Sequence, residues 1–208
     1  KSAKNYQEIG LEFGIFSRQM NEIIAEPGFP LLFGVGPKLE RALIELMLEH
    51  HVRYGYEEIS VPTVIHERTL FLAGSFPKHQ DNVYKLESSN LYLNPTIEMQ
   101  QTSLIYQRCF KTEELPLKVV GFARSFRIER GRQMDFYTNL HEFGKVESFT
   151  ACTEDQYEQV LTDLSGMLEE LLDKLGFVWR KLLLCTGDMG QAGSFTCDYE
   201  VYAPGSDK

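Results

Sequence analysis

The sequence predicts an α+β fold in which a mostly antiparallel sheet is flanked by helices. Two long segments, 36–54 and 153–176, carry apolar residues at helical spacing, and the stretches between and after them are rich in β-branched and aromatic residues. The chain has 208 residues, of which 43% are hydrophobic. Because this is enough apolar surface to bury one core, we expect one domain.

Two helices are expected before the first strand. Residues Tyr6–Arg18 follow a short amphipathic pattern. A longer helix has Pro37 in its first turn, where a missing N–H costs no hydrogen bond, and Gly55 provides its stop signal. His50 and His51, near its end, are expected at an interface or on the surface rather than in a metal site.

The next long helix begins at Thr153, which forms a Thr-x-x-Gln capping box with Gln156, and it ends at Gly176. Its apolar stripe from Tyr157 to Leu175 predicts core packing. Strands are expected at 56–61, 91–93, 119–128, 143–149, 177–184 and 197–202.

Alternation along three of these strands gathers charged residues on one side of the sheet. The residues that share a face are Arg127 with Glu129, Phe143 with Lys145 and Glu147, and Asp198 with Glu200 and Tyr202. Arginine can neutralise a phosphate, carboxylates can hold magnesium or an ammonium group, and a phenyl ring can stack on a base. The pattern suits an anionic, aromatic ligand that carries an amine. A solvated face with surface ion pairs is the alternative.

Composition and charge argue against several other classes of protein. The formal charge of −9 argues against a nucleic-acid grip by this domain alone, because such a surface is normally basic. The four cysteines form no Cys-x-x-Cys pair, which argues against a zinc ribbon. No apolar run approaches the ~20 residues that cross a bilayer, so no membrane partner is expected.

Seven short motifs follow one another along the chain. They are 34–43, 55–62, 74–78, 93–98, 126–129, 143–147, and 184–190 with 198–201. In this order they resemble the dimer helix, the motif 1 strand, the Gly-x-x-Pro-Lys loop, the Thr-x-Glu loop, the two motif 2 strands and the late core of the bacterial-type seryl-tRNA synthetases. These enzymes are class II aminoacyl-tRNA synthetases, and the resemblance covers about residues 6–204.

The resemblance implies a pocket for serine, ATP and Mg²⁺. Arg127 would be the catalytic residue and would bind both the α-phosphate of ATP and the serine carboxylate. The other implied roles are Glu129 on the adenine amino group, Phe143 beneath the base, Thr96 and Glu98 on the serine side chain, Glu147 on its ammonium, and Glu200 on magnesium. Such a site works by positioning and charge neutralisation, without a protein nucleophile.

The loop between the motif 2 strands departs from the family. Asn139 stands where the family usually has an arginine for the γ-phosphate, and Arg130–Leu140 is a short loop in which polar and glycine residues are replaced by Met134, Phe136 and Tyr137. Losing a phosphate-binding cation costs on the order of 2–5 kcal/mol. Arg130 and Arg132 are the candidates to replace it.

Three functions remain open on the sequence. The first is a catalytically impaired paralogue, which dimerises through the helix Leu39–His50 with itself or with an active seryl-tRNA synthetase. The second is an active serine–tRNA ligase that charges tRNA(Ser). The third is a ligase that charges a carrier protein, although the Thr-x-Glu loop is absent from relatives of that kind. We expect residues 1–208 to be a catalytic core without the tRNA-binding arm and the motif 3 segment, and an intracellular location in the cytoplasm or mitochondrial matrix.

Overall fold

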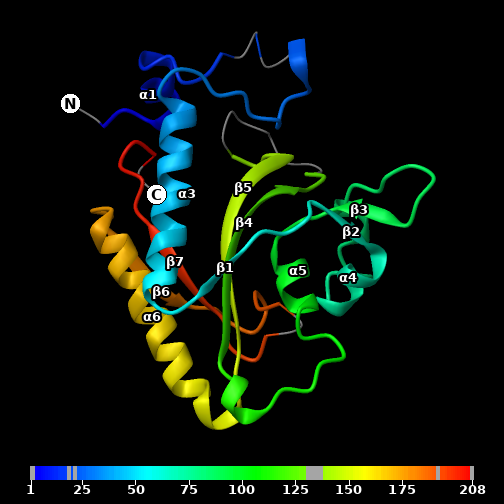
Figure 1. Ribbon diagram of the computed structural model, residues 1–208. Coiled ribbons are helices and arrows are strands. Elements are labelled where there is room, and N and C mark those ends of the chain that lie inside the picture. Colours follow the sequence, from blue (N-terminus) through cyan, green and yellow to red (C-terminus); the bar gives the residue numbers. More distant parts are fainter. Residues whose placement is uncertain (1–2, 18–19, 21–22, 130–137, 191–192, 207–208) are drawn as a thin grey trace.

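A long antiparallel hairpin of β4 and β5 forms the centre of the computed structural model (Figure 1). The structure describes residues 3–17, 20, 23–129, 138–190 and 193–206. The helices are α1 (Tyr6–Glu12), α3 (Gly36–Arg53), α4 (Glu67–Leu72), α5 (Glu98–Ser103) and α6 (Tyr157–Lys174). The strands are β1 (Glu57–Ile59), β2 (Val64–His66), β3 (Leu91–Leu93), β4 (Leu117–Phe126), β5 (Glu142–Ala151), β6 (Trp179–Leu183) and β7 (Cys197–Val201).

β4 is the central strand, since β1 pairs with it in parallel and β5 pairs with it antiparallel. The β4–β5 register runs from Leu117 opposite Ala151 to Phe126 opposite Glu142. Val119, Val120 and Gly121 are buried in succession, so both faces of the strand are covered at this point. From Gly121 to Phe126 buried residues alternate with half-buried ones.

Secondary structure covers both sides of the hairpin. In Figure 1, α3 and α6 lie on one side, and α4, α5 and the β2–β3 pair lie on the other. On the α6 side, Tyr56, Val120 and Met167 form one buried cluster. The β2–β3 side has a second buried cluster, formed by Ile65, Leu70, Phe76, Val83, Tyr92 and Met99. The predicted α+β class with helices flanking a sheet is confirmed.

Two predicted boundaries differ from the structure. The first helix ends at Glu12 because Gly14 takes a positive φ of 60° and turns the chain. The helix after Thr153 begins with a 3₁₀ turn at Glu154–Gln156, and the predicted capping box is present.

The strand predicted at 119–128 is β4, which begins at Leu117 and ends at Phe126, two residues earlier than predicted at each end. Arg127 and Glu129 therefore follow the strand, and the alternation that assigned them a common face does not apply. The backbone N–H of Arg127 still donates to the carbonyl of His141, at 2.9 Å. Both side chains therefore leave the sheet at its end, where a pocket can form beside it.

The expectation for His50 and His51 was wrong. Both are buried, with exposed fractions of 2% and 5%. The Nε2 of His50 lies 2.8 Å from the carbonyl oxygen of Met167 on α6, and the Nδ1 of His51 lies 2.7 Å from that of Met47. The helix pattern alone could not indicate that α6, more than 100 positions later, would cover this face of α3.

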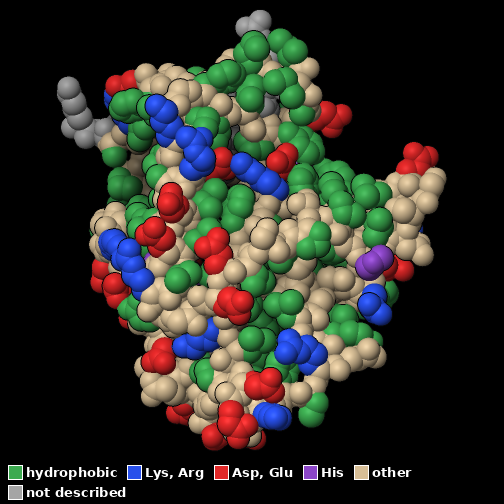
Figure 2. Space-filling view, viewed as in Figure 1, with side chains coloured by type: hydrophobic (Ala, Val, Ile, Leu, Met, Phe, Trp, Pro, Cys, Tyr) green, Lys and Arg blue, Asp and Glu red, His purple; other side chains and the backbone are tan. Residues whose placement is uncertain are grey.

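The surface carries mixed charge. On the face seen in Figure 2, acidic and basic side chains are interspersed rather than gathered by sign. Within the described ranges, none of the helices has the length and apolar character needed to span a bilayer.

A substitution at Gly121 on β4 tests how tightly the sheet packs against Ile59 and Ile97. A Cβ there would lie 2.7 Å from the Ile59 carbonyl oxygen and 2.8 Å from Ile97 Cδ1. We expect Gly121→Ala to lower the free energy of unfolding by about 1–3 kcal/mol, as measured by chemical denaturation. Gly166→Ala is the control, because open space surrounds that helical position and the change should stabilise by about 0.5–1 kcal/mol. Equal effects of the two substitutions would contradict the packing described.

The burial of His51 predicts that the stability of the fold depends on pH. Burial lowers the pKa of His51 below 6.5, with a smaller contribution from His50, and the Met47 carbonyl opposes the shift. The unfolded chain therefore binds a proton more readily, and stability should fall as the pH drops from 7 through 6.5 toward the lowered pKa. In urea titrations at several pH values, His51→Gln should show a weaker fall than the wild type. The exposed-site variant His79→Gln should keep the wild-type slope.

Candidate active site

The Thr-x-Glu loop is fixed from both sides by backbone hydrogen bonds. The N–H of Asn94 donates to the Thr63 carbonyl, and the N–H of Phe126 donates to the Asn94 carbonyl, each at 2.9 Å. Thr96 and Ile97 are buried against the sheet. The loop thus carries Thr96 to the β5 side chains across the hairpin.

Thr96, Lys145 and Glu147 form a closed network. The Thr96 hydroxyl donates to Glu147 Oε2 at 2.6 Å, and Lys145 Nζ donates to Thr96 Oγ1 and to Glu147 Oε1, each at 2.8 Å. The N–H of Glu98 lies 3.1 Å from Glu147 Oε2, and the Gln101 amide donates to the Glu147 carbonyl at 2.8 Å. A charged cradle with both signs is therefore built before any ligand enters.

Arg127 is positioned by its own Nε. This atom donates to the Pro95 carbonyl at 3.0 Å, and the guanidinium carbon lies 5.1 Å from the centre of the Phe143 ring. The terminal nitrogens have no hydrogen-bond partner among the described residues, so two parallel donors remain for a carboxylate or phosphate.

His141 supports the backbone of Arg127. Its Nδ1 lies 2.8 Å from the Arg127 carbonyl oxygen and 2.9 Å from the Tyr84 hydroxyl, and its ring stacks on Phe29 at 5.5 Å. The contact with a carbonyl requires the proton on Nδ1. Through these contacts His141 links the backbone of Arg127 to Tyr84.

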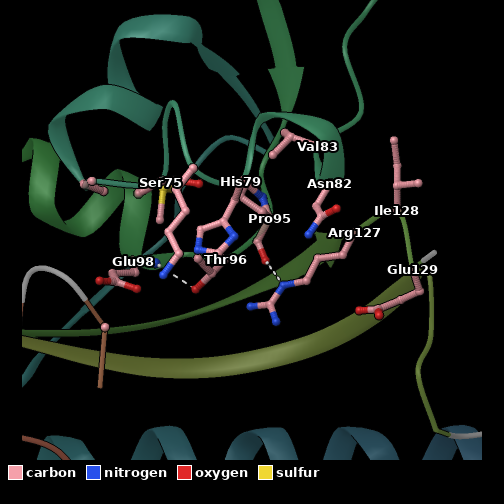
Figure 3. Close-up of a pocket in the computed structure, with 15 residues that line it drawn as sticks. Ser75, His79, Asn82, Val83, Pro95, Thr96, Glu98, Arg127, Ile128 and Glu129 are labelled. Carbon is pink, nitrogen blue, oxygen red and sulfur yellow. Dashed lines mark hydrogen bonds between the residues drawn. The ribbon is translucent and has the colours of Figure 1, made fainter. Parts of the chain in front are cut away.

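A cavity of about 560 Å³ opens beside these groups. Its walls include Ser75, Lys78, His79, Asn82, Thr96, Glu98, Arg127 and Glu129. Figure 3 shows the side chains of His79 and Asn82 facing Arg127 and Thr96 across the cavity. The Gly74–Lys78 motif indicated one wall, but nothing in the sequence indicated His79 and Asn82, which lie at a short 3₁₀ turn after that motif.

Glu98 is electrostatically strained. Burial raises its pKa above 4.5, the neighbouring Glu147 carboxylate raises it further, and Lys145 and Arg127 oppose the shift. A carboxylate that is held charged at a cost to the fold, beside free guanidinium donors, is typical of a ligand site.

Glu200 lies apart from this group. It is on β7, in the β6–β7 pair, where its carboxylate forms an ion pair with Arg180. It does not line the cavity, and no three His, Cys, Asp or Glu side chains in the described parts of the chain are arranged to hold a metal ion. These residues alone do not fit Mg²⁺, which takes six oxygen ligands, and the magnesium role of Glu200 stays a prediction.

The motif 2 loop is only partly described. Arg130, Arg132, Met134, Phe136 and Tyr137 lie outside the described residues. Asn139 has a φ of +55°, in the left-handed region that asparagine tolerates better than most side chains. The position where the family usually has an arginine thus has a left-handed backbone conformation.

Comparison with known proteins gives the class of the molecule. Residues 84–208 match the family model described as tRNA synthetase class II core domain (G, H, P, S and T). The chain belongs to this family of class II tRNA synthetase core domains.

Within the family the chain is seryl-tRNA synthetase-like. It is 36% identical over 206 residues to a serine–tRNA ligase of Chloroflexus aurantiacus, covering 98% of this chain and 49% of that protein. It is 39% identical over 186 residues to one from the aster yellows witches'-broom phytoplasma, covering 87% and 44%. The seryl-tRNA synthetase of Pyrococcus horikoshii complexed with ATP superposes with a TM-score of 0.94 at 25% identity, covering 100% of this chain and 47% of that one. The chain spans about half the length of these relatives.

The charge on Glu98 can be tested through stability. Because the folded state raises its pKa, the charged form costs free energy at pH 7, and this cost disappears as the pH falls through the raised pKa toward 4. We expect Glu98→Gln to melt at a higher temperature than the wild type at pH 7 and at nearly the same temperature at pH 4. Glu87→Gln, in an exposed turn, is the control and should change neither value. A lower melting temperature for Glu98→Gln at pH 7 would contradict the strain.

Proposed function

We propose that the cavity binds serine and ATP as a seryl-adenylate-type site, and that turnover in this chain is impaired. One observation supports the proposal above all others. Thr96 and the N–H of Glu98 contact Glu147 of β5, and Thr96, Glu98 and Arg127 line the same cavity. A small amino acid needs this combination of a carboxylate for its ammonium and a guanidinium for its carboxylate.

In the proposed reaction the serine carboxylate attacks the α-phosphate of ATP in line, and pyrophosphate leaves. The free donors of Arg127 bind the carboxylate and the α-phosphate, which neutralises charge that builds up in the transition state. Glu147 holds the ammonium, while Thr96 and Glu98 recognise the serine side chain.

The nucleotide would lie along the same wall. Glu129 lines the cavity and would accept from the adenine amino group. Phe143, whose ring lies against the Arg127 guanidinium outside the cavity lining, would stack beneath the base. The Pyrococcus horikoshii relative was solved with ATP, and a Naegleria fowleri serine–tRNA ligase with AMP, which supports a nucleotide here. Magnesium would enter with the nucleotide phosphates. Glu200 stays its predicted ligand, although its carboxylate pairs with Arg180 outside the cavity lining.

The proposed impairment comes from position 139. A short neutral side chain on a left-handed backbone cannot replace a cation at the γ-phosphate. The alternative is an active serine–tRNA ligase that charges tRNA(Ser) as part of a longer protein. It is supported by the motifs that contain Arg127, Thr96 and Glu147, because these motifs resemble those of the family.

We also propose a dimer, either of two copies or with an active seryl-tRNA synthetase. Three apolar side chains on and beside α3 support it, because Val35, Leu39 and Val52 are exposed. For a chain of this family we keep an intracellular location, in the cytoplasm or mitochondrial matrix, as part of the proposal.

The adenylate site is tested by binding of the non-hydrolysable analogue serylsulfamoyl adenosine to the complete protein, measured by calorimetry. Arg127→Ala should weaken binding about 100-fold, since a charged hydrogen-bonding partner is lost. Arg108→Ala removes an exposed guanidinium that rests on Phe110 outside the cavity, and it should bind like the wild type. If Arg127→Ala binds equally well, the site assignment is wrong.

Impairment is tested separately by serine-dependent ATP–pyrophosphate exchange. We expect a rate roughly 30- to several-thousand-fold below that of the Chloroflexus aurantiacus ligase, from the missing cation. Exchange within tenfold of that enzyme, with analogue binding intact, would favour the active ligase.

A further inference from the structure

The network around Glu147 already contains an ammonium group, that of Lys145. Its Nζ contacts Glu147 Oε1 and Thr96 Oγ1, each at 2.8 Å. These two atoms belong to the side chains that would receive the ammonium and the hydroxyl of serine. The chain therefore places its own cation where the proposed function requires a ligand cation.

A count of lone pairs shows how little capacity is left. The Thr96 hydroxyl donates to Glu147 and accepts from Lys145 Nζ and from the N–H of Glu98, the last at 3.3 Å, which uses both its lone pairs. Glu147 Oε2 accepts from Thr96 and from the same N–H. Only Oε1 retains a free lone pair, whereas a substrate ammonium has three donors to satisfy.

Lys145 can leave the network. Its side chain is 31% exposed, while that of Glu147 is 21% exposed, so the lysine has a route to water. A lysine ammonium is a compact point charge on a flexible stem, and it is well solvated once released. The carboxylate and the hydroxyl stay fixed by the Glu98 N–H and by the Gln101 amide on the Glu147 backbone.

We infer that Lys145 is a tethered competitor that occupies the ammonium position of the amino-acid site and must be displaced by any ligand amine. The inference rests on the proposed amino-acid pocket and adds its regulation. Because the competent, open state is only part of the population, the apparent dissociation constant of every amine ligand is raised by the same factor. Ligands that lack an ammonium do not experience this competition.

The first test compares three probes by calorimetry: L-serine, ethanolamine, which is serine without its carboxylate, and glycerate, which has a hydroxyl in place of the amine. Lys145→Met should bind L-serine and ethanolamine about tenfold or more tightly than the wild type, by the same factor. Glycerate affinity should not increase. The control Lys118→Met removes a lysine of the same sheet that lies over the Tyr56 ring, and it should match the wild type with all probes.

The outcomes separate this inference from the proposed function. Tighter ethanolamine binding without any serine binding supports the competitor and refutes the serine assignment. Unchanged or weaker ethanolamine binding by Lys145→Met overturns the competitor, and serine binding by the wild type then stands on its own.

A second test needs no substitution, so it remains decisive if Lys145→Met folds poorly. Wild-type protein is acetylated briefly with an amine-selective reagent, with and without saturating L-serine, and each lysine is quantified by mass spectrometry. Displacement predicts that serine increases the acetylation of Lys145 severalfold and leaves that of Lys118 unchanged. Protection of Lys145, or no change, overturns the inference.

Discussion

The site depends on the close approach of the Thr-x-Glu loop to the central strand at Gly121. Gly121 is the β4 partner of Glu147, and the Ile97 side chain lies where a Cβ on Gly121 would be. Because the strand has no side chain at this point, the loop reaches the sheet and carries Thr96 to the Glu147 carboxylate. One register pair thus fixes both the packing of the loop and the centre of the polar network.

The same network holds Glu147 in place and makes the charged form of Glu98 less favourable. Glu147 is held by four groups from three segments, whereas burial and that same carboxylate raise the pKa of nearby Glu98. A carboxylate with a raised pKa beside a guanidinium is typical of a ligand site. The sheet, the buried loop and His141 supply the rigidity that keeps Arg127 and the carboxylates in place.

Much of the architecture was predictable from the sequence, because strong local signals coincide with it. Apolar periodicity gave the two long helices, and the motif order gave the class II core. Of the predicted site residues, Thr96, Glu98, Arg127 and Glu129 line the cavity, whereas Phe143, Glu147 and Glu200 do not. The network of Thr96, Lys145 and Glu147 was only partly predictable. Alternation placed Lys145 and Glu147 on one face of the strand, but the hydrogen bond between Lys145 and Thr96 joins residues 49 positions apart, which local sequence cannot indicate. The burial of His50 and the end of β4 at Phe126 were missed for the same reason.

The most direct measurement is a crystal structure of the complete protein soaked with L-serine and a non-hydrolysable ATP analogue. We expect the serine carboxylate on the terminal nitrogens of Arg127, its ammonium on Glu147, and Lys145 Nζ moved out toward solvent. Serine bound away from Glu147, or an unmoved Lys145 beside a bound amino acid, would contradict this expectation.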